Sequence, residues 1–331
     1  MKALVYTSPK ALEYREEPGP LVPSGECLVR VEAVGICGSD MHAYLGHDER
    51  RPAPLILGHE GAGVVVEGPL QGKRVTVNPL ATCGKCRACL TGRNNLCPGR
   101  QILSMVPRQG AFAELIAIPA ENLVEMPDDV SFEKACLAEP LACGWHGVRL
   151  GAAALDLPLA EARCLVIGGG AIGLGAALAL TAQGARDVTI SEANPRRLPA
   201  LKSAGKFTIA SPDAIMAAQA GGYDMVIDGV GFAATRASAS RATRPGGVIV
   251  HIGLGDADGG LDIRRMTLQE ITFIGAYTYT PQDFRDTAAA IFDGRLGPLD
   301  WPEIRDLENG AEAFADILNG RASAPKIILK P

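Results

Sequence analysis

The stretch Cys164-Leu-Val-Ile-Gly168-Gly169-Gly170-Ala171-Ile172-Gly173 decides the fold of this chain. Its first four residues are typical of a buried strand, its glycines predict a tight turn, and residues 174–183 predict an apolar helix that Gly184 ends. A second strand follows at 188–191 and carries Glu192 at its end. A Gly-x-Gly-x-x-Gly turn between a strand and a helix, followed about twenty positions later by an acidic residue, indicates a dinucleotide-binding unit.

Glu192 and the basic residues after it bear on which dinucleotide binds. The glycines of the turn let a pyrophosphate approach the helix N-terminus, where free N–H groups favour an anion. The Glu192 carboxylate can accept hydrogen bonds from a ribose 2′-hydroxyl and would repel a 2′-phosphate, so the sequence predicts NAD in preference to NADP. Arg196 and Arg197 temper this prediction, because an arginine there can stack on adenine or accept a phosphate. A solvated helix start is the alternative, which we favour for Arg196.

The rest of this half repeats the alternation of strands and helices. Apolar segments predict strands at 225–228, 248–252 and 271–274, with a helix near 235–243. This order predicts an α/β domain with a doubly wound parallel sheet, which binds ligands at the carboxyl ends of its strands. The glycines that follow these strands are expected to line the cofactor cleft: Gly229, Gly231, Gly253 and Gly255.

The N-terminal half has a different residue pattern. Short, alternating β-branched segments predict strands of a mainly antiparallel β domain at 4–6, 27–34 and 61–66. A chain of 331 residues, 47% of them hydrophobic, is long enough for two domains. A helix at 283–292, the segment 311–318 and a strand at 326–329 return to the first domain. We therefore predict a catalytic domain of residues 1–145 and 278–331 and a nucleotide domain of residues 146–277.

Composition excludes some partners. The formal charge is −5, and the Lys and Arg residues are scattered, so we expect neither nucleic acid nor an anionic membrane as a partner. The longest apolar segment, 171–182, is too short to span a bilayer, and the turn residues at Ser8-Pro9 leave no room for a secretory signal. We expect a cytoplasmic protein that acts on a small molecule.

Residues 35–63 hold a set of possible metal ligands. The stretch opens with Gly35-Ile-Cys37-Gly-Ser39-Asp40-Met-His42 and closes with Gly58-His59-Glu60-Gly-Ala-Gly63. A thiolate, an imidazole and a carboxylate suit zinc, and the hydroxyl and second imidazole beside them can move protons. The alternative is a chance grouping of a buried Cys, a loop His and a surface Glu. Between the two motifs, residues 50–54 (Arg-Arg-Pro-Ala-Pro) predict a stiff connection, either a surface loop or a wall of a substrate cleft.

A second candidate metal site lies in one short segment, Cys83-Gly-Lys-Cys86-Arg-Ala-Cys89 with Cys97 shortly after. Four cysteines so spaced can close a tetrahedral site, which predicts a structural zinc. A redox Cys-x-x-Cys or a disulfide pair is the alternative, but a redox motif usually opens a helix of a βαβ unit, which this segment lacks. The odd total of nine cysteines also favours metal thiolates over disulfides.

Glu139 stands in an otherwise apolar stretch, at the far end of a helix predicted to start at Ser131. It is either a helix-end carboxylate or a group that faces the metal. We favour the second, because a charge among apolar neighbours is costly unless it is paired or bound to a metal.

As a set, these motifs resemble those of the zinc-containing medium-chain alcohol and polyol dehydrogenases, over essentially the whole chain. The resemblance rests on the 35–42 and 58–60 motifs, the four cysteines, Glu139-Pro140, the glycine turn and the closing Lys326-Ile-Ile-Leu. It implies a GroES-like catalytic domain, with a zinc lobe at about 80–100, and a Rossmann NAD-binding domain. It further implies two zinc ions per chain and a homodimer or homotetramer.

The resemblance also implies roles for single residues. Cys37, His59 and either Glu60 or Glu139 would hold the catalytic zinc, and the four cysteines the structural one. An open zinc position makes a substrate alcohol lose its proton more readily. Ser39 would take that proton, His42 would pass it to solvent, and Asp40 would orient His59. Contacts with NAD would come from Ile172, Glu192, Arg197, Ile252, Gly253, Leu254, Ala276 and Tyr277.

Two departures from the family pattern bear on the substrate. Glu139 stands where classical alcohol dehydrogenases commonly have a third Cys, which points to the sorbitol, threonine and butanediol branch. Gly275-Ala-Tyr-Thr278 lacks the Arg of the Gly-x-Phe-Arg found in polyol members, which counts against sorbitol-like substrates. We expect NAD-dependent oxidation of a secondary alcohol of a polyol, diol or hydroxy amino acid. The alternatives are a primary alcohol dehydrogenase and a non-catalytic nucleotide-binding protein, and the proton path through Ser39 and His42 argues against the latter.

Overall fold

The chain forms two compact units in the computed structural model, which describes residues 1–217 and 222–331. The first unit comprises Met1–Glu139, Thr280–Asp293 and Pro302–Pro331, and the second Pro140–Tyr279 and Gly294–Trp301. These divisions fall close to the predicted boundaries at 145/146 and 277/278. Residues 294–301, which the prediction gave to the catalytic domain, group with the second unit instead.

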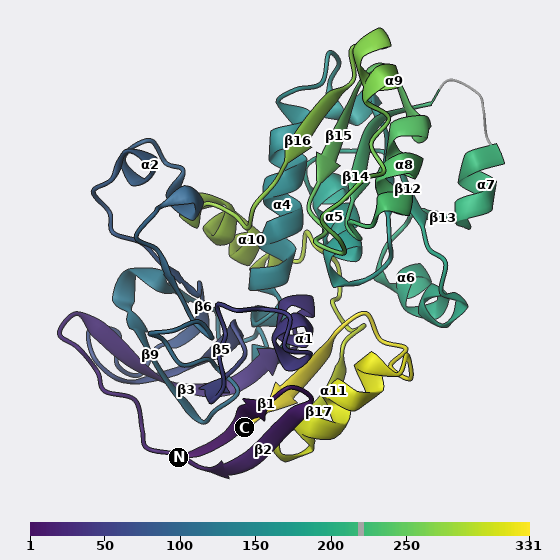
Figure 1. Cartoon of the computed structure of the whole chain (residues 1–331). Coiled ribbons are helices and arrows are strands. Elements are labelled where there is room, and N and C mark those ends of the chain that lie inside the picture. Colours follow the sequence, from purple (N-terminus) through teal and green to yellow (C-terminus); the bar gives the residue numbers. More distant parts are fainter. Residues whose placement is uncertain (218–221) are drawn as a thin grey trace. The chain divides into compact units, whose positions relative to one another are not determined.

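The first unit is built on β-sheets (Figure 1). Its largest sheet has seven strands in the order β10-β6-β5-β3-β18-β17, with β9 also paired to β3, and two smaller sheets have the orders β2-β1-β4 and β7-β8. The predicted strands at 4–6, 27–34 and 61–66 are confirmed as β1, β3 and β5. The strands are β1 Lys2–Ser8, β2 Ala11–Glu16, β3 Glu26–Gly35, β4 Leu55–Ile56, β5 Glu60–Glu67, β6 Arg74–Val77, β7 Leu80–Ala81, β8 Gln101–Ile102, β9 Leu115–Pro119, β10 Leu123–Glu125, β17 Glu303–Asp306 and β18 Ile327–Lys330.

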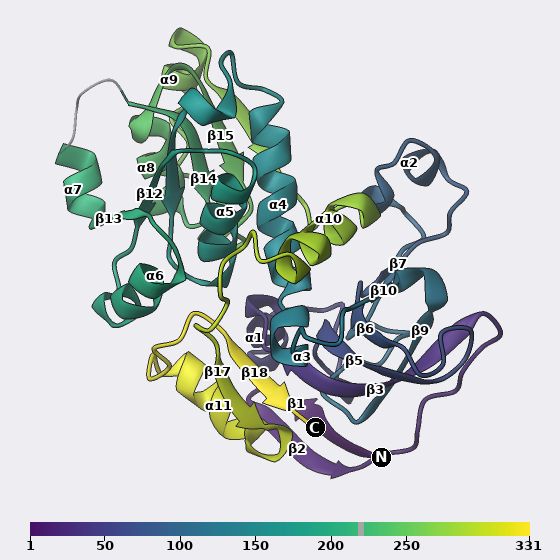
Figure 2. The same cartoon turned by 180° about the vertical axis from the view of Figure 1, so that it is seen from behind.

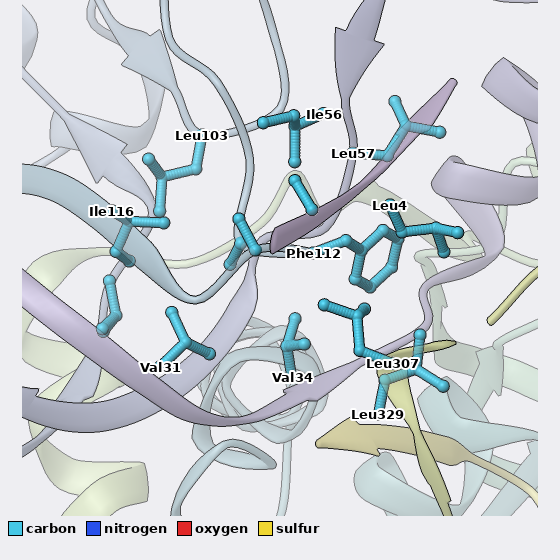
Figure 3. Close-up of a cluster of buried hydrophobic side chains, with 14 of the residues drawn as sticks. Leu4, Val31, Val34, Ile56, Leu57, Leu103, Phe112, Ile116, Leu307 and Leu329 are labelled. Atoms are coloured by element: carbon cyan, nitrogen blue, oxygen red, sulfur yellow. The ribbon is translucent and has the colours of Figure 1, made fainter. Parts of the chain in front are cut away.

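The C-terminal tail completes this unit. Strand β18 pairs antiparallel with β3, and Figures 1 and 2 show the last segments of the chain beside its first strands. Buried side chains from β1, β3, β18 and the loop before β9 meet in one core, among them Leu4, Val31, Phe112 and Leu329 (Figure 3). Burial of each such side chain contributes about 1.5–3 kcal/mol, so the tail is part of the fold and not an appendage.

A capping residue fixes the start of one short helix of this unit, α3. The Ser131 hydroxyl accepts a hydrogen bond from Lys134 N, which confirms the predicted helix start. That helix ends after one turn, however, and a new helix, α4, begins at Ala138. Glu139 therefore lies in the first turn of a helix, and the prediction that placed it at a helix end was wrong. The helices of this unit are α1 Gly38–Tyr44, α2 Arg87–Leu90, α3 Phe132–Ala135, α10 Pro281–Phe292 and α11 Gly310–Leu318.

The second unit contains a six-stranded parallel sheet in the order β13-β12-β11-β14-β15-β16. This is the doubly wound order that the sequence predicted. The prediction missed β13, which has three residues, and it started β15 at 248, whereas that strand begins at Thr243 and includes Gly246 at φ +72. The strands are β11 Arg163–Ile167, β12 Asp187–Ser191, β13 Thr208–Ala210, β14 Tyr223–Asp228, β15 Thr243–His251 and β16 Thr272–Gly275.

Helices cover both faces of this sheet (Figure 2). On one face, Gly151 of α4 approaches Val250 and Met225 closely. Their strand neighbours Ile249 and Val226 pack in a cluster that includes Ala239 of α8. Successive side chains of a strand point to opposite faces, so α4 and α8 lie on opposite sides. The helices are α4 Ala138–Ala152, α5 Ala171–Ala182, α6 Leu198–Ala204, α7 Pro212–Ala217, α8 Ala233–Ala242 and α9 Ile263–Leu268. Among the helices described, none is long and apolar enough to cross a lipid bilayer.

Candidate metal and cofactor sites

Strand pairing brings the two ends of residues 35–63 together. Strands β3 and β5 pair antiparallel with Gly35 opposite Glu60. Cys37 therefore lies just after the end of β3, next to His59, which lies just before the start of β5. Ligand atoms of Cys37, His59 and Glu60 all lie within 4.8 Å of one another. A Cβ atom at Gly35 would come within 2.0 Å of Glu60 Oε2, so the absence of a side chain at this position leaves room for the carboxylate.

The His59 ring is held from both sides. Its Nδ1 lies 3.2 Å from Ser104 Oγ and 3.4 Å from Asp40 Oδ1, and its Nε2 lies 3.4 Å from Ser39 Oγ. The Asp40 carboxylate also accepts hydrogen bonds from Cys37 N at 3.0 Å and Gly58 N at 3.2 Å. Burial opposes the charge of Asp40, yet His59 and nearby donors hold its pKa below the ordinary value. These are the contacts expected of a carboxylate that fixes a ligand's orientation.

Glu60 is paired on one oxygen only. The buried Lys326 ammonium donates to Glu60 Oε1 at 2.6 Å and to Ile36 O at 2.8 Å. Glu60 Oε2 is buried without a hydrogen-bond partner among residues 1–217 and 222–331. A bare buried carboxylate oxygen is costly, and a bound cation would relieve that cost. Thiolate, imidazole and carboxylate donors around one point therefore fit zinc.

Lys326 is a functional candidate that the sequence analysis named as part of the closing motif but gave no role. Burial disfavours its charge, but the nearby Glu60, Cys37 and Glu139 raise the pKa of Lys326 above its ordinary value. It lies 266 residues from Glu60 in the chain, so no local pattern links the two. The only signal was a single Lys in front of the apolar Ile-Ile-Leu of the last strand.

Glu139 is buried near this group but is not one of its members. It is close enough to Lys326 to raise the pKa of that lysine. Its carboxylate is not among the ligand atoms that converge within 4.8 Å, which are those of Cys37, His59 and Glu60. Of the two carboxylates considered from the sequence, Glu60 is thus the one grouped with the thiol and the imidazole.

Helix α1 carries the predicted proton path. Ser39 is half-buried and faces His59, and His42 is exposed in the last turn of the helix. Positions three apart on a helix share a face, so Ser39 and His42 lie on the same face of α1.

Arg51 and Ser104 are further residues that the sequence did not assign to the site. Pro52, Ala53 and Pro54 are exposed, as expected of a surface loop, but Arg51 turns inward and is buried. Its Nη1 donates to Ser39 O at 3.1 Å and its Nε donates to Ser104 O at 2.9 Å. An Arg at the start of a proline-rich loop gives no signal of such contacts.

The four cysteines also converge. Their sulfur atoms lie within 4.8 Å of one another, with Cys86–Cys89 and Cys83–Cys97 sulfur pairs at 3.5 Å, and none forms a disulfide in the described structure. Four sulfurs around one zinc at roughly 2.3 Å would be separated by roughly 3.8 Å, so the arrangement fits that ion. Backbone N–H groups of Lys85 and Cys86 lower the pKa of Cys83 to about 6, which favours the thiolate that a metal requires.

The glycine turn and Glu192 form a third group, in the second unit. Gly168 has φ +96, and a Cβ at Gly173 would lie 1.8 Å from Gly168 O, so both positions suit glycine. The Glu192 carboxylate accepts hydrogen bonds from Gly169 N at 2.7 Å and Asn194 N at 2.6 Å. Arg197 Nη1 lies 3.4 Å from the same carboxylate. The phosphate-binding turn and the predicted ribose-binding residue are therefore adjacent.

The other predicted NAD contacts follow neighbouring strands of the same sheet. Ile172 lies at the start of α5, residues 252–254 follow β15, and Ala276 and Tyr277 follow β16. A Cβ at Gly231 would lie 2.2 Å from Gly253 O, so the loops after β14 and β15 touch. The predicted contacts thus gather at the carboxyl ends of the strands, where doubly wound sheets bind ligands.

Two family models match most of the chain. Residues 23–128 match the alcohol dehydrogenase GroES-like domain, and residues 171–293 match the zinc-binding dehydrogenase family. The chain is 33% identical over 339 residues to sorbitol dehydrogenase of Bacillus subtilis, covering 96% of this chain and 95% of that protein. It is 30% identical over 309 residues to L-galactonate-5-dehydrogenase of Escherichia coli, covering 89% and 88%.

Solved structures agree with these matches, and they include a complex with NADH and a complex with NADP. An alcohol dehydrogenase of E. coli CFT073 complexed with NADH has a TM-score of 0.90 at 25% identity, covering 100% of this chain and 99% of that one. A putative zinc-binding dehydrogenase of Sinorhizobium meliloti bound to NADP has a TM-score of 0.87 at 28% identity, with the same coverage. The chain belongs to the zinc-binding medium-chain alcohol dehydrogenase family, with its GroES-like and Rossmann-type domains, and is an oxidoreductase that acts on CH–OH groups.

Proposed function

We propose that this protein oxidises a secondary alcohol of a polyol, diol or hydroxy amino acid, with NAD as hydride acceptor. The observation that carries the proposal is the convergence of Cys37, His59 and Glu60 with the Ser39 hydroxyl beside them. Relatives named for sorbitol and L-galactonate support a polyhydroxylated substrate. Thr278, where polyol members carry an Arg, counts against a substrate identical to sorbitol.

Cys37, His59 and Glu60 would hold the catalytic zinc, and Glu139 would lie behind them as a second carboxylate near Lys326. When bound, zinc supplies a Lewis acid that polarises an alcohol oxygen, and NAD supplies the hydride acceptor. Asp40 and Ser104 keep His59 in one orientation through its Nδ1.

In the proton path, the Ser39 hydroxyl accepts the proton of the alcohol and passes its own toward His42. The exposed imidazole of His42 then releases a proton to water, a role that histidine commonly has in proton shuttles. The Ser39 hydroxyl lies 3.4 Å from His59 Nε2, so it sits next to the proposed metal ligands.

The four cysteines would hold a second, structural zinc, which gives two zinc ions per chain. Their convergence from one segment leaves no position for a substrate. The free thiols of the described structure support a reducing compartment, and we propose the cytoplasm. A homodimer or homotetramer is proposed from the family resemblance alone.

NAD is proposed in preference to NADP because Glu192 lies beside the glycine turn. Glu192→Ala should raise the KM for NAD about tenfold, because NAD loses the acceptor of its 2′-hydroxyl, and should lower the KM for NADP, because the charge that repels its 2′-phosphate is gone. Arg196→Ala, which leaves the carboxylate in place, is the matched control. Equal changes for the two cofactors would overturn the preference.

The proposed reaction is tested by a panel of secondary and primary alcohols, polyols and hydroxy amino acids, followed through NADH absorbance with zinc-loaded protein. We expect turnover of at least one secondary alcohol at a higher kcat/KM than any primary alcohol. Highest kcat/KM for primary alcohols would contradict the substrate class. Tight binding of NADH with no turnover of any compound would contradict the proposed reaction itself.

A further inference from the structure

We infer that Arg51 is a positioning residue for the proposed proton acceptor: one guanidinium holds both serines that contact His59 and fixes the direction of the Ser39 hydroxyl. The inference rests on the role proposed for Ser39. It concerns a residue that makes no contact with substrate, because the Arg51 side chain is only 1% exposed.

Each nitrogen of the guanidinium has a distinct partner. Nε donates to Ser104 O at 2.9 Å, Nη1 donates to Ser39 O at 3.1 Å and to Asp48 Oδ2 at 2.9 Å, and Nη2 lies 3.4 Å from Ser39 Oγ. The guanidinium is planar and rigid, so these contacts fix the spacing between the two serines. Three segments are tied at one point: the start of α1, the 45–54 connection and the loop after β8.

Those two serines touch opposite sides of the His59 ring. Ser104 Oγ lies 3.2 Å from Nδ1, and Ser39 Oγ lies 3.4 Å from Nε2. Arg51 therefore sets, through two backbone carbonyls, the positions of the hydroxyls on both sides of a proposed zinc ligand.

Ser104 needs such support. It is buried and has φ +67, a left-handed conformation that is unfavourable for a residue with a side chain. The hydrogen bond from Arg51 Nε to its carbonyl helps to hold this conformation. Without it, we expect the Ser104 backbone to relax and its hydroxyl to leave His59 Nδ1.

The Ser39 hydroxyl is also restricted chemically. A guanidinium only donates hydrogen bonds and stays charged, so Arg51 can occupy an acceptor position of Ser39 Oγ but cannot take its proton. The hydroxyl must then release its own proton elsewhere as it accepts one from the alcohol. The positive charge of Arg51 beside Ser39 Oγ disfavours a hydroxyl oxygen that carries two protons. Acceptance of the alcohol proton by Ser39 is therefore coupled to the release of its own proton.

The charge of Arg51 is matched locally. Asp48 lies 2.9 Å from it, and burial of Asp48 opposes the carboxylate charge, but Arg50 and Arg51 hold the pKa of Asp48 below its ordinary value. Arg50 binds the same Asp48 carboxylate at 2.8 Å but is exposed, with 62% of its side chain accessible. Arg50 therefore shares the charge partner without reaching either serine, which makes it the matched control.

The test compares Arg51→Met, Arg51→Lys and Arg50→Met in the zinc-loaded protein. Loss of the guanidinium should lower kcat by about 10- to 100-fold, because small displacements of positioned groups have effects of that size. The KM for NAD should not change, and with zinc supplied in excess the zinc content should not change either. Arg51→Lys keeps the charge but not the fork, so its kcat should stay well below the parent value, and Arg50→Met should change kcat less than about twofold.

A crystal structure of each Arg51 variant gives a readout that does not depend on turnover. We expect Ser104 to leave its left-handed conformation and Ser104 Oγ to move beyond hydrogen-bonding distance of His59 Nδ1. Unmoved serines in the variants, or a parent kcat in Arg51→Lys, would overturn the inference. Zinc loss in proportion to the fall in kcat would also overturn it, because Arg51 would then merely support the ligands. If the parent turned over no alcohol, the proposed function would fail, and the serine positions would still decide this inference.

Discussion

The two groups of candidate metal ligands in the first unit are built in opposite ways. The four cysteines come from one segment, and backbone N–H groups of that segment favour the thiolate of Cys83. Cys37, His59 and Glu60 come from two loops joined by strand pairing, and Lys326 reaches Glu60 from the far end of the chain. The first group is locally complete, whereas the second depends on the whole unit being folded.

This difference matches the work of each site. Four thiolates close the coordination of zinc and suit a structural role, while three ligands leave a position for a substrate. An open site has to keep its ligands in place without the fourth bond, and here Asp40, Ser104 and Lys326 hold them. Substitutions of ligands in the two groups should therefore have different consequences.

Cys37→Ala should have the largest effect on activity. Without the thiolate the proposed catalytic zinc should be lost, and kcat/KM should fall by about 10⁴-fold or more, since metal polarisation contributes several kcal/mol to such reactions. NADH binding, measured by fluorescence titration, should persist because the glycine turn lies in the other unit. Activity within tenfold of the parent would contradict the assignment.

Cys86→Ala should lower the stability of the protein and should not act on the chemical step of the reaction. Loss of one thiolate opens the closed site, and the free energy of unfolding should fall by about 3–5 kcal/mol, because structural zinc binding contributes directly to folding. Urea unfolding of the parent and the variant measures the change. The matched variant is Cys27→Ala, a buried thiol outside both groups, whose loss should not depend on added zinc. A zinc-independent loss in Cys86→Ala would count against a structural ion.

Lys326→Met tests the long-range support of the second group. With zinc removed, Glu60 would be a buried carboxylate without a counter-charge, which should cost about 3 kcal/mol of stability. With zinc bound the loss should be smaller, because the ion replaces the ammonium charge. Urea unfolding with and without a chelator gives both values. Lys330→Met, at the exposed C-terminal end of β18, is the control, and equal losses in the two variants would contradict the role of Lys326.

Ser104→Ala should have the smallest effect. It removes the hydroxyl from His59 Nδ1 but leaves Asp40 at 3.4 Å, so affinity for one of the two zinc ions should fall about tenfold. Competition with a chromophoric chelator measures this affinity. Ser131→Ala, which removes the cap of α3, should lower stability without changing zinc affinity. Identical zinc affinities in both variants and the parent would exclude Ser104 from the site.

The same contrast explains what the sequence could predict. The cysteine segment, the glycine turn and the strands β11, β12, β14, β15 and β16 have local patterns, and each was found at or near its expected place, although β15 begins at Thr243, five residues before the predicted start. The break between α3 and α4 was missed because both segments are helical, so the pattern did not show the interruption before Glu139. The roles of Lys326, Ser104 and Arg51 were missed because the contacts Lys326–Glu60, Ser104–His59 and Arg51–Ser104 join residues 266, 45 and 53 positions apart and leave no periodicity.

The most direct test of this account is the zinc content of the parent, Cys37→Ala and Cys86→Ala proteins by mass spectrometry. Two independent sites predict close to two ions per chain in the parent and close to one in each variant, with turnover lost in Cys37→Ala. A parent value near zero, or a value that Cys37→Ala leaves unchanged, would contradict the account.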